Sequence, residues 1–404
     1  MSKKMKLIPD LRFPDFKNSK QWNEASLNKL ANRALLKNRD SLITTVFTNS
    51  AIDGIVDQRE YFDKDIANKN NLENYYVVEP GDYVYNPRIS NVAPVGPLFK
   101  NKTNKTGVMS PLYTVFRFNE KDNEFYEYYF KSRHWHDSIR KVANTGARFD
   151  RISITDSTFM EIPVLFPEPK EQQKIASCLS SLDKLIAAHS DKLEALKDHK
   201  KGLTKIIFPQ KGQKVPNYRF PEFEKDGAWV EKEIGKIADN LDSRRIPITR
   251  NKREKGNIPY YGASGIIDYV KEYIFDEDLL LISEDGANLI ARVYPIAFSI
   301  SGKTWVNNHA HVLKFENWFT QVLVEKYLNS KNIEDFLTGM AQPKLNRQKL
   351  DLIPIHLPKS EEEQQKIASC LSSLDELITA QLEKIEQLQQ HKKGLMQGLF
   401  PNTK

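Results

Sequence analysis

The side chains best suited to recognition chemistry lie in one basic segment. Residues 244–255 read RRIPITRNKREK, with six basic side chains and one acidic one. The segment YYGASG follows at 260–265, where glycine lets another backbone come close. Arginine pairs bidentately with guanine, asparagine reads adenine, and lysine mostly contacts phosphate. The composition of this segment therefore predicts a DNA-contacting surface.

The candidate DNA contacts fall into two groups, one in each half of the chain. The stronger group comprises Arg244, Arg245, Arg250, Lys252, Arg253, Lys255, Tyr260, Tyr261 and Ser264. The weaker group comprises Arg88, Lys100, Lys102, Asn104 and Lys105, with Arg148 and Arg151 as further candidates that could instead hold the domain to its helix. For any single residue the alternative is a solvated loop, and the clustering favours DNA contact.

Catalytic motifs are missing from the sequence. It contains no G-x-x-x-x-G-K-[ST] phosphate loop. Asn86-Pro87-Arg88 is the nearest match to the Asn-Pro-Pro-aromatic signature of adenine methyltransferases, and it lacks the second proline and the aromatic residue. The histidine pairs 134/136 and 309/311 have no further ligands at a usual metal spacing. We therefore expect no catalytic centre and no metal site in this chain.

These candidate surfaces must be positioned by an internal repeat. Residues 171–182 read EQQKIASCLSSL, and residues 363–374 repeat them without change. HKKGL recurs at 199–203 and 391–395, and RFPDF at 12–16 is echoed by RFPEF at 219–223. Each half therefore reads as an entry motif, a domain and a long helix. The predicted segments are a first domain (1–168), a helix (169–209), a second domain (210–359) and a second helix (360–404).

Both repeat helices carry a coiled-coil seam. Positions spaced alternately by four and three residues are apolar over about 37 residues, which is long for a globular helix. The seam comprises Ile175, Leu179, Leu182, Ile186, His189, Leu193 and Leu196 in one helix and Ile367, Leu371, Leu374, Ile378, Gln381, Ile385 and Leu388 in the other. Polar residues interrupt it at equivalent places, at His189/Gln381 and Lys200/Lys392. We expect the helices to pair antiparallel about a pseudo-two-fold axis near His189 and Gln381.

Two local features qualify this helix prediction. Ser360 and Glu363 form the sequence of a capping box, in which each side chain bonds the other residue's N–H. Gly202 and Gly394 each cost a helix about 1 kcal/mol relative to alanine. Either the helix frays there or a partner helix packs closely, and we favour fraying.

Charge and composition fit a nucleic-acid-binding protein without proving it. The 60 basic and 53 acidic residues give a net charge of +7. No apolar run approaches the length of a membrane span, and the first residues lack the apolar region of a secretory signal. The two cysteines would lie too far apart in an antiparallel pair to bridge, which fits a reducing cytoplasm. We expect a cytoplasmic protein.

The duplicated EQQKIASCLSSLD, HKKGL and RFP blocks make the chain resemble the specificity subunit of type I restriction–modification enzymes. PYYGASG at 259–265, SEDGAN at 283–288 and NNHAH at 307–311 add to the likeness. The resemblance implies a two-domain α/β (α+β) repeat whose globular target-recognition domains are separated by an antiparallel coiled coil. Each domain would read half of a bipartite DNA target, and the coil would set the spacing.

The resemblance also implies partners. Two methyltransferase subunits would dock on the coil, and restriction subunits would join them. S-adenosylmethionine and ATP with Mg²⁺ would be bound by those partners, so this chain would need no cofactor and would not be an enzyme. The alternative is a stand-alone restriction or methyltransferase enzyme with a coiled-coil dimerisation arm, which would need a nucleotide or S-adenosylmethionine site. A third possibility, a purely structural adaptor, leaves both domains unexplained.

Overall fold

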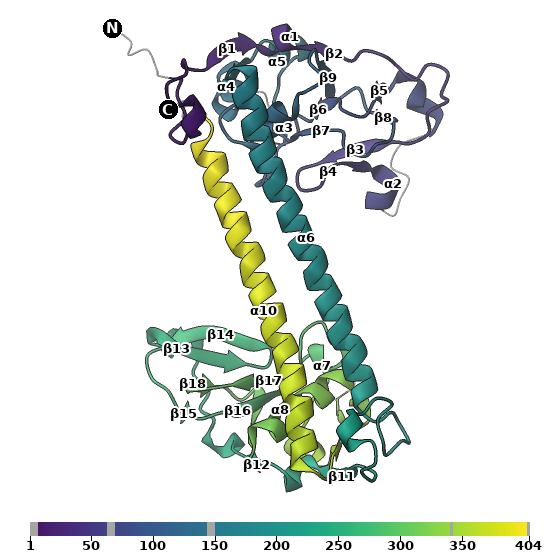
Figure 1. Cartoon of the computed structure of the whole chain (residues 1–404), viewed down its shortest axis with the longest axis vertical. Coiled ribbons are helices and arrows are strands. Elements are labelled where there is room, and N and C mark those ends of the chain that lie inside the picture. Colours follow the sequence, from purple (N-terminus) through teal and green to yellow (C-terminus); the bar gives the residue numbers. More distant parts are fainter. Residues whose placement is uncertain (1–6, 63–68, 144–149, 340–341, 402–404) are drawn as a thin grey trace. The chain divides into compact units, whose positions relative to one another are not determined.

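The computed structural model describes residues 7–62, 69–143, 150–339 and 342–401. The chain divides into two compact units, residues 1–188 with 385–404 and residues 189–384. The two long helices are α6 (Pro169–Ile207) and α10 (Glu361–Gly398), and each contributes one segment to each unit (Figure 1). The predicted mixed fold with two domains and two long helices is confirmed. No helix of the described residues is long and apolar enough to cross a membrane.

The first unit contains a small antiparallel sheet in the order β2-β9-β6-β7, with two further strand pairs, β3-β4 and β5-β8. Rings from β6, β9 and α3 fill its core, where Tyr85 stacks on Phe159 at 4.3 Å between centroids. The elements of this domain are η1 (Pro14–Phe16), β1 (Asn23–Ser26), α1 (Leu27–Leu30), β2 (Ala31–Arg33), β3 (Phe47–Ser50), β4 (Gly54–Asp57), α2 (Gln58–Tyr61), η2 (Lys69–Asn74), β5 (Tyr76–Val78), β6 (Tyr83–Tyr85), β7 (Leu98–Lys100), β8 (Gly107–Met109), β9 (Thr114–Phe118), α3 (Glu124–Lys131), α4 (His136–Val142), α5 (Asp156–Met160) and β10 (Pro163–Phe166).

The second unit contains two four-stranded sheets, β12-β19-β16-β17 and β14-β13-β18-β15. All their strand pairs are antiparallel except β13 with β18. The elements of this domain are η3 (Pro221–Phe223), β11 (Val230–Glu233), η4 (Ile234–Lys236), β12 (Asp239–Asn240), η5 (Asp242–Arg244), η6 (Arg250–Lys252), β13 (Lys255–Gly262), β14 (Gly265–Val270), β15 (Phe275–Asp276), β16 (Leu279–Ser283), α7 (Asn288–Ala291), β17 (Ala297–Ile300), β18 (Lys303–Val306), β19 (Ala310–Lys314), α8 (Trp318–Ser330), η7 (Glu334–Phe336), α9 (Arg347–Asp351) and β20 (Pro354–Leu357).

Both units use the same frame to join their domain to a long helix. In the first, β1 pairs with β10 just before α6 begins, and in the second, β11 pairs with β20 just before α10 begins. The arginine of the entry motif then clamps the first turn of the helix. Arg12 Nε and Nη2 donate to Glu171 at 2.8 and 2.6 Å. Arg219 donates to Glu363 at 2.7 and 2.6 Å in the same bidentate way.

The long helices are antiparallel where they meet inside each unit. In the first unit Asp183 of α6 pairs with Lys392 of α10, and Ile175 shares a core with Leu399. In the second unit Lys200 pairs with Asp375. Every predicted seam position is buried or half-buried. The seam periodicity therefore identified the packed faces of both helices, and the seam lysines are matched by aspartates.

The polar pair His189 and Gln381 is formed within the second unit. Gln381 Nε2 donates to the carbonyl oxygen of His189 at 2.8 Å and lies 2.6 Å from His189 Nδ1. This contact confirms that the two residues face one another in the antiparallel pair.

Two local expectations about the helices need correction. Ser360 accepts the N–H of Glu363 at 3.2 Å, but the Glu363 carboxylate does not complete the capping box because Arg219 holds it. Fraying at the glycines was also wrong, since α6 and α10 continue through Gly202 and Gly394. Among the described residues, nothing lies within 4 Å of where a Cβ would stand at either glycine.

Candidate nucleic-acid interface

The basic segment of the second unit begins at η5 and ends in strand β13. It contains the short η6 turn and leads into the β13–β14 hairpin, whose tip is Ala263-Ser264. The two strands pair antiparallel from Ile258↔Val270 to Gly262↔Gly265. The register shifts once in this stretch, between Tyr260 and Tyr261. The hairpin and the η6 turn that precedes it along the chain are together called the hairpin edge.

Several candidates in this segment contact their own domain. Arg245 is 13 % exposed, donates to Glu284 at 2.7 Å and to the Ala310 carbonyl at 2.8 Å. Arg253 pairs with Asp268 at 3.0 Å, and its guanidinium lies over the Tyr260 ring. Because Tyr260 is itself buried, these three side chains hold the loop to the sheet. The DNA surface proposed below does not include them.

Arg244 and Tyr261 are partly exposed and also contact their own domain. Arg244 is 45 % exposed, although it pairs with Glu277 at 2.8 Å and covers the Phe275 ring. Tyr261 is half-buried beside Phe298. Both have a structural role within the domain, and Arg244 also has enough free surface to meet a phosphate.

The remaining candidates of this segment face solvent. Arg250, Lys252 and Lys255 are exposed, and within the described part of the chain no hydrogen bond or ion pair engages their side chains. Ser264 is exposed at the hairpin tip. Strand β14 adds exposed apolar side chains that were not among the predicted contacts: Ile266, Ile267 and Tyr269 are 47, 51 and 52 % exposed. The closeness of these three apolar residues in the sequence was the one indication of this apolar strip before the structure was known.

The first unit has a more dispersed set. Lys100 is 11 % exposed, pairs with Glu124 at 3.4 Å and lies over the Tyr83 ring, so its role is structural. Arg88, Lys102 and Lys105 are exposed but have carboxylate neighbours at 3.7, 3.1 and 3.7 Å. Asn104 is exposed with a left-handed backbone (φ 56°) that suits a turn tip. Arg148 lies outside the described residues.

The histidines of the 309/311 pair have structural partners within the domain. His311 is buried, with Nδ1 2.6 Å from Asp242 and Nε2 2.8 Å from the Leu345 carbonyl. Burial alone would raise the pKa of Asp242, but hydrogen bonds from His311 and the Val312 N–H hold it below its usual range. His309 lies 2.9 Å from Asp285. No cluster of three metal-ligating side chains exists among the described residues.

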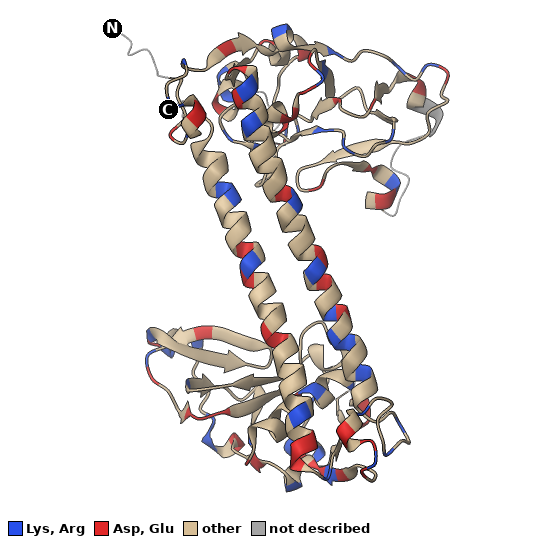
Figure 2. Cartoon of the chain, in the orientation of Figure 1, with Lys and Arg blue, Asp and Glu red and all other residues tan. Residues whose placement is uncertain are grey.

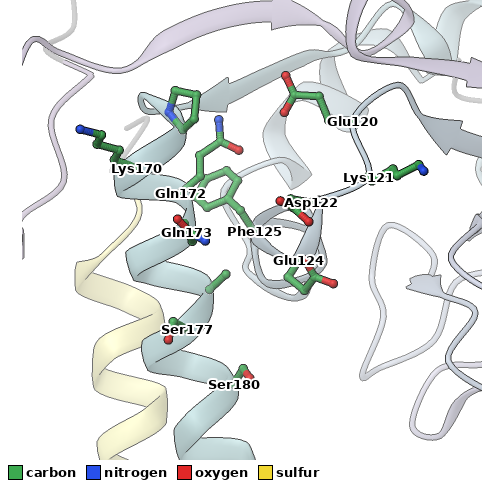
Figure 3. A pocket seen from close by; sticks show the side chains of 12 residues that line it. Glu120, Lys121, Asp122, Glu124, Phe125, Lys170, Gln172, Gln173, Ser177 and Ser180 are labelled. Carbon is green, nitrogen blue, oxygen red and sulfur yellow. The ribbon is translucent and has the colours of Figure 1, made fainter.

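Each unit also has a groove beside the start of its long helix. In the first unit it measures about 660 Å³, and in the second about 580 Å³. Figure 3 shows the α6 side of the first groove, Gln172, Gln173, Ser177 and Ser180, with Glu120, Asp122 and Glu124 on the domain. Basic and acidic residues are interspersed along both long helices (Figure 2). The helices therefore offer mixed surfaces, unlike the basic hairpin edge.

Comparison with known proteins identifies the family. The family described as the type I restriction modification DNA specificity domain matches residues 43–198 and again 227–390. The chain belongs to this family. It is a DNA-recognition subunit, and the alternative of a stand-alone enzyme is not favoured.

Individual relatives of the chain are described as specificity subunits. A candidate type I restriction enzyme specificity subunit of Haemophilus influenzae, S.HindORF215P, is 37 % identical over 143 residues, covering 35 % of this chain and 37 % of that protein. The MjaX specificity subunit of Methanocaldococcus jannaschii, also a candidate, is 26 % identical over 71 % of this chain and 69 % of its own length. The alignment thus spans little more than a third of the first relative.

Solved structures share the fold at low sequence identity. The type I restriction–modification S subunit from M. genitalium superposes with a TM-score of 0.63 at 16 % identity, covering 98 % of this chain and all of that one. A chain from a study of the assembly and conformational transition of a type I R-M system gives a TM-score of 0.54 at 14 % identity, covering 94 % of this chain and 97 % of that one. These likenesses show the fold.

Proposed function

We propose that each unit reads one half of a bipartite DNA target and that the paired helices set the spacer between the halves. The carrying observation is the duplicated frame: two different domains are attached to long helices that begin with the same sequence block, by equivalent strand pairs and equivalent Arg–Glu clamps. Two domains that differ in sequence but are attached in the same way can each recognise a different DNA half-site.

The reading surface of the second unit is the hairpin edge with Arg250, Lys252, Lys255 and Ser264. These side chains are free to contact phosphates or base edges, whereas Arg245 and Arg253 keep the loop in place. The exposed β14 strip adds apolar surface that could meet thymine methyl groups. In the first unit the candidate contacts are the more dispersed Arg88, Lys102, Asn104 and Lys105. The carboxylates beside Arg88, Lys102 and Lys105 would have to be exchanged for phosphate.

The partner subunits dock on the exposed part of the duplicated helix sequence. Core packing explains Ile175, Leu179 and their counterparts, but Gln173, Ser177 and Ser181 are exposed in the first copy, as are Gln365, Ser369 and Ser373 in the second. Small side chains spaced by four residues allow another helix to approach closely. Two identical surfaces suit two copies of one methyltransferase subunit, and the open Gly202 and Gly394 give further sites of close approach.

Chemistry in this proposal belongs to the partners. The methyltransferase subunits would bind S-adenosylmethionine, restriction subunits joining them would bind ATP and Mg²⁺, and this chain would be non-catalytic. A protein that acts on DNA with these partners would work in the cytoplasm. Its two free cysteines, Cys178 and Cys370, are compatible with that reducing compartment.

A domain exchange tests the proposal. The full chain is expressed with a type I methyltransferase subunit in a methylation-free host, and methylated sites are mapped by sequencing. Replacing residues 20–155 with those of another family member should change one half of the methylated motif and leave the other half and the spacer intact. If both halves change together, or if no bipartite motif is found for the unaltered chain, the proposal fails.

A further inference from the structure

One aspartate in each repeat makes two contacts, one with the neighbouring long helix and one with the recognition domain. Asp183 Oδ1 pairs with Lys392 of the neighbouring helix. Its other oxygen, Oδ2, accepts the Tyr128 hydroxyl of α3 at 2.8 Å. Tyr128 is only 2 % exposed, so its hydroxyl is aimed at the helix from inside the recognition domain.

The second copy repeats this arrangement with a different donor. Asp375 Oδ1 pairs with Lys200 of the neighbouring helix, and Oδ2 lies 2.9 Å from Lys326 Nζ of α8. Lys326 is 12 % exposed and also pairs with Glu325, whose other oxygen accepts the Ser299 N–H at 3.0 Å. A chain of polar contacts therefore runs from the long helix into strand β17 of the domain.

A seam role alone does not account for both contacts. Pairing the two long helices needs only the lysine of the opposite helix, which one carboxylate oxygen satisfies. The second oxygen faces the domain helix that packs against the coil, and in each unit that helix supplies a donor, Tyr128 or Lys326. Apolar contacts between domain and coil, such as Phe125 with Phe400 and Tyr327 with Phe208, are non-directional by comparison.

The ionisation states suit directional bonds. Burial would raise the pKa of Asp183, but hydrogen bonds from Lys392 and Tyr128 lower it below its usual range. Burial raises the pKa of Tyr128 far above neutrality, so its hydroxyl stays protonated and donates. For Asp375, bonds from Lys200 and Lys326 likewise overcome burial and lower the pKa. Hydrogen bonds to charged acceptors are short and about twice as strong as neutral ones.

We propose that Asp183 and Asp375 are positioning residues, each fixing its recognition domain on its own part of the helix pair and thereby the spacer length that the protein accepts. This proposal rests on the proposed function, because it assumes two half-sites at a set spacing. The aspartates touch no DNA in it. They limit rocking of a domain on its helices, so their loss broadens the range of spacers without changing the bases that are read.

The test measures spacer discrimination. The full chain, in complex with its methyltransferase subunit, binds duplexes that carry the same two half-sites with spacers varied one base pair at a time. In Asp183→Asn and Asp375→Asn we expect the affinity ratio between the best spacer and its neighbours to fall about tenfold, the equivalent of one lost charged hydrogen bond. The preferred bases of both half-sites should stay as in the wild type.

Matched variants separate positioning from folding. Tyr128→Phe and Lys326→Met remove the domain donor and leave the seam pair, so each should reproduce the effect of the corresponding aspartate change. Combining Tyr128→Phe with Asp183→Asn should add little. Asp191→Asn, an exposed carboxylate on α6, should leave spacer discrimination intact.

The outcomes separate this inference from the proposed function. Unchanged discrimination in Tyr128→Phe and Lys326→Met overturns the inference, and so does a uniform loss of affinity with discrimination kept. A wild-type protein that shows no preference among spacers overturns the proposed function instead.

Discussion

At the scale of single residues, the two Arg–Glu clamps are buried ion pairs, so each charge depends on its partner for compensation. Arg219 and Glu363 are 6 and 0 % exposed, and Trp229 Nε1 also donates to Glu363 at 3.3 Å. Removing one partner leaves the other charge buried without compensation. Glu363→Gln should therefore lower the free energy of unfolding by about 3–5 kcal/mol, measured by urea denaturation. Glu361→Gln in the same turn is exposed and serves as the control, with a change within about 0.5 kcal/mol.

The clamps also show what the sequence could and could not reveal about residue roles. The echo of RFPDF by RFPEF marked Arg12 and Arg219 as equivalent, but their partners lie 159 and 144 positions away along the chain. Composition marked the basic segment at 244–255 as a candidate DNA-contacting surface. It could not separate Arg245, whose acceptors come from residues 284 and 310, from the free Arg250. Such a distinction depends on tertiary contacts.

The free basic residues give a second prediction at this scale. Replacing Arg250, Lys252 and Lys255 with alanine should weaken binding to all DNA sequences and reduce the salt slope of log K by about 1 for each phosphate that the variant no longer neutralises. If one of the three reads a base, discrimination at one target position should fall by about 1–3 kcal/mol instead. Binding is measured by fluorescence anisotropy at several salt concentrations.

The control for this prediction comes from the same segment. Arg245→Ala should lower thermal stability because Glu284 and the Ala310 carbonyl lose a donor. The triple alanine variant should unfold like the wild type. Wild-type affinity and salt slope in that variant would remove the hairpin edge from the DNA interface.

At the scale of elements, regular periodicity predicted which faces of the two long helices are packed. The seam positions of α6 and α10 followed from their spacing alone, and all are buried or half-buried. Residues 124–142 form two helices, α3 and α4, with Ser132 extended at the end of α3. Strand β13 is poorly marked in the sequence, because Gly256, Asn257 and Pro259 interrupt a strand pattern and the ladder is shifted there.

The polar pair in the seam provides a prediction about helix pairing. Gln381 is 7 % exposed and bonds His189 instead of packing against an apolar side chain. Changing His189 and Gln381 to leucine together should raise the free energy of unfolding by about 1–3 kcal/mol, since burying each leucine is worth more than the lost hydrogen bonds. The same change should weaken the register, so that chains associate through their helices.

Two measurements test the double leucine variant. Denaturation gives the stability, and sedimentation velocity shows whether the variant forms dimers at concentrations where the wild type does not. Lower stability, or a monomer as well defined as the wild type, would mean that the pair does not act as a register device. Leu185→Ala, at an exposed position of α6, controls for helix propensity.

At the scale of the whole molecule, the internal repeat determines how each domain is attached to the long helices. Each domain is attached to the start of one long helix and to the end of the other. Leu399 and Phe400 pack in the core of the first unit, as Ile207 and Phe208 do in the second. The repeat predicted an antiparallel helix pair, and the packing of each helix end in the other unit's core agrees with that pairing. The bases that each domain reads do not follow from it, since they depend on surfaces in which the two domains differ.

Changing the coil length gives the last prediction. One heptad inserted near His189 and one near Gln381 keep the seam in register and lengthen each helix by about 10 Å. That length corresponds to about three base pairs, which also turn one half-site about 100° around the DNA axis. The lengthened protein should prefer a spacer longer by about three base pairs, or bind weakly if the DNA cannot twist enough.

The matched control inserts a heptad into one helix only. It displaces half of the seam residues from their partners, so stability should fall and no new spacer should be favoured. Half-site preferences should be unchanged in the double insertion, because neither domain is altered. If the double insertion binds the original spacer with the original affinity, the helices do not act as the ruler, and direct contact with the methyltransferase subunits must position the domains instead.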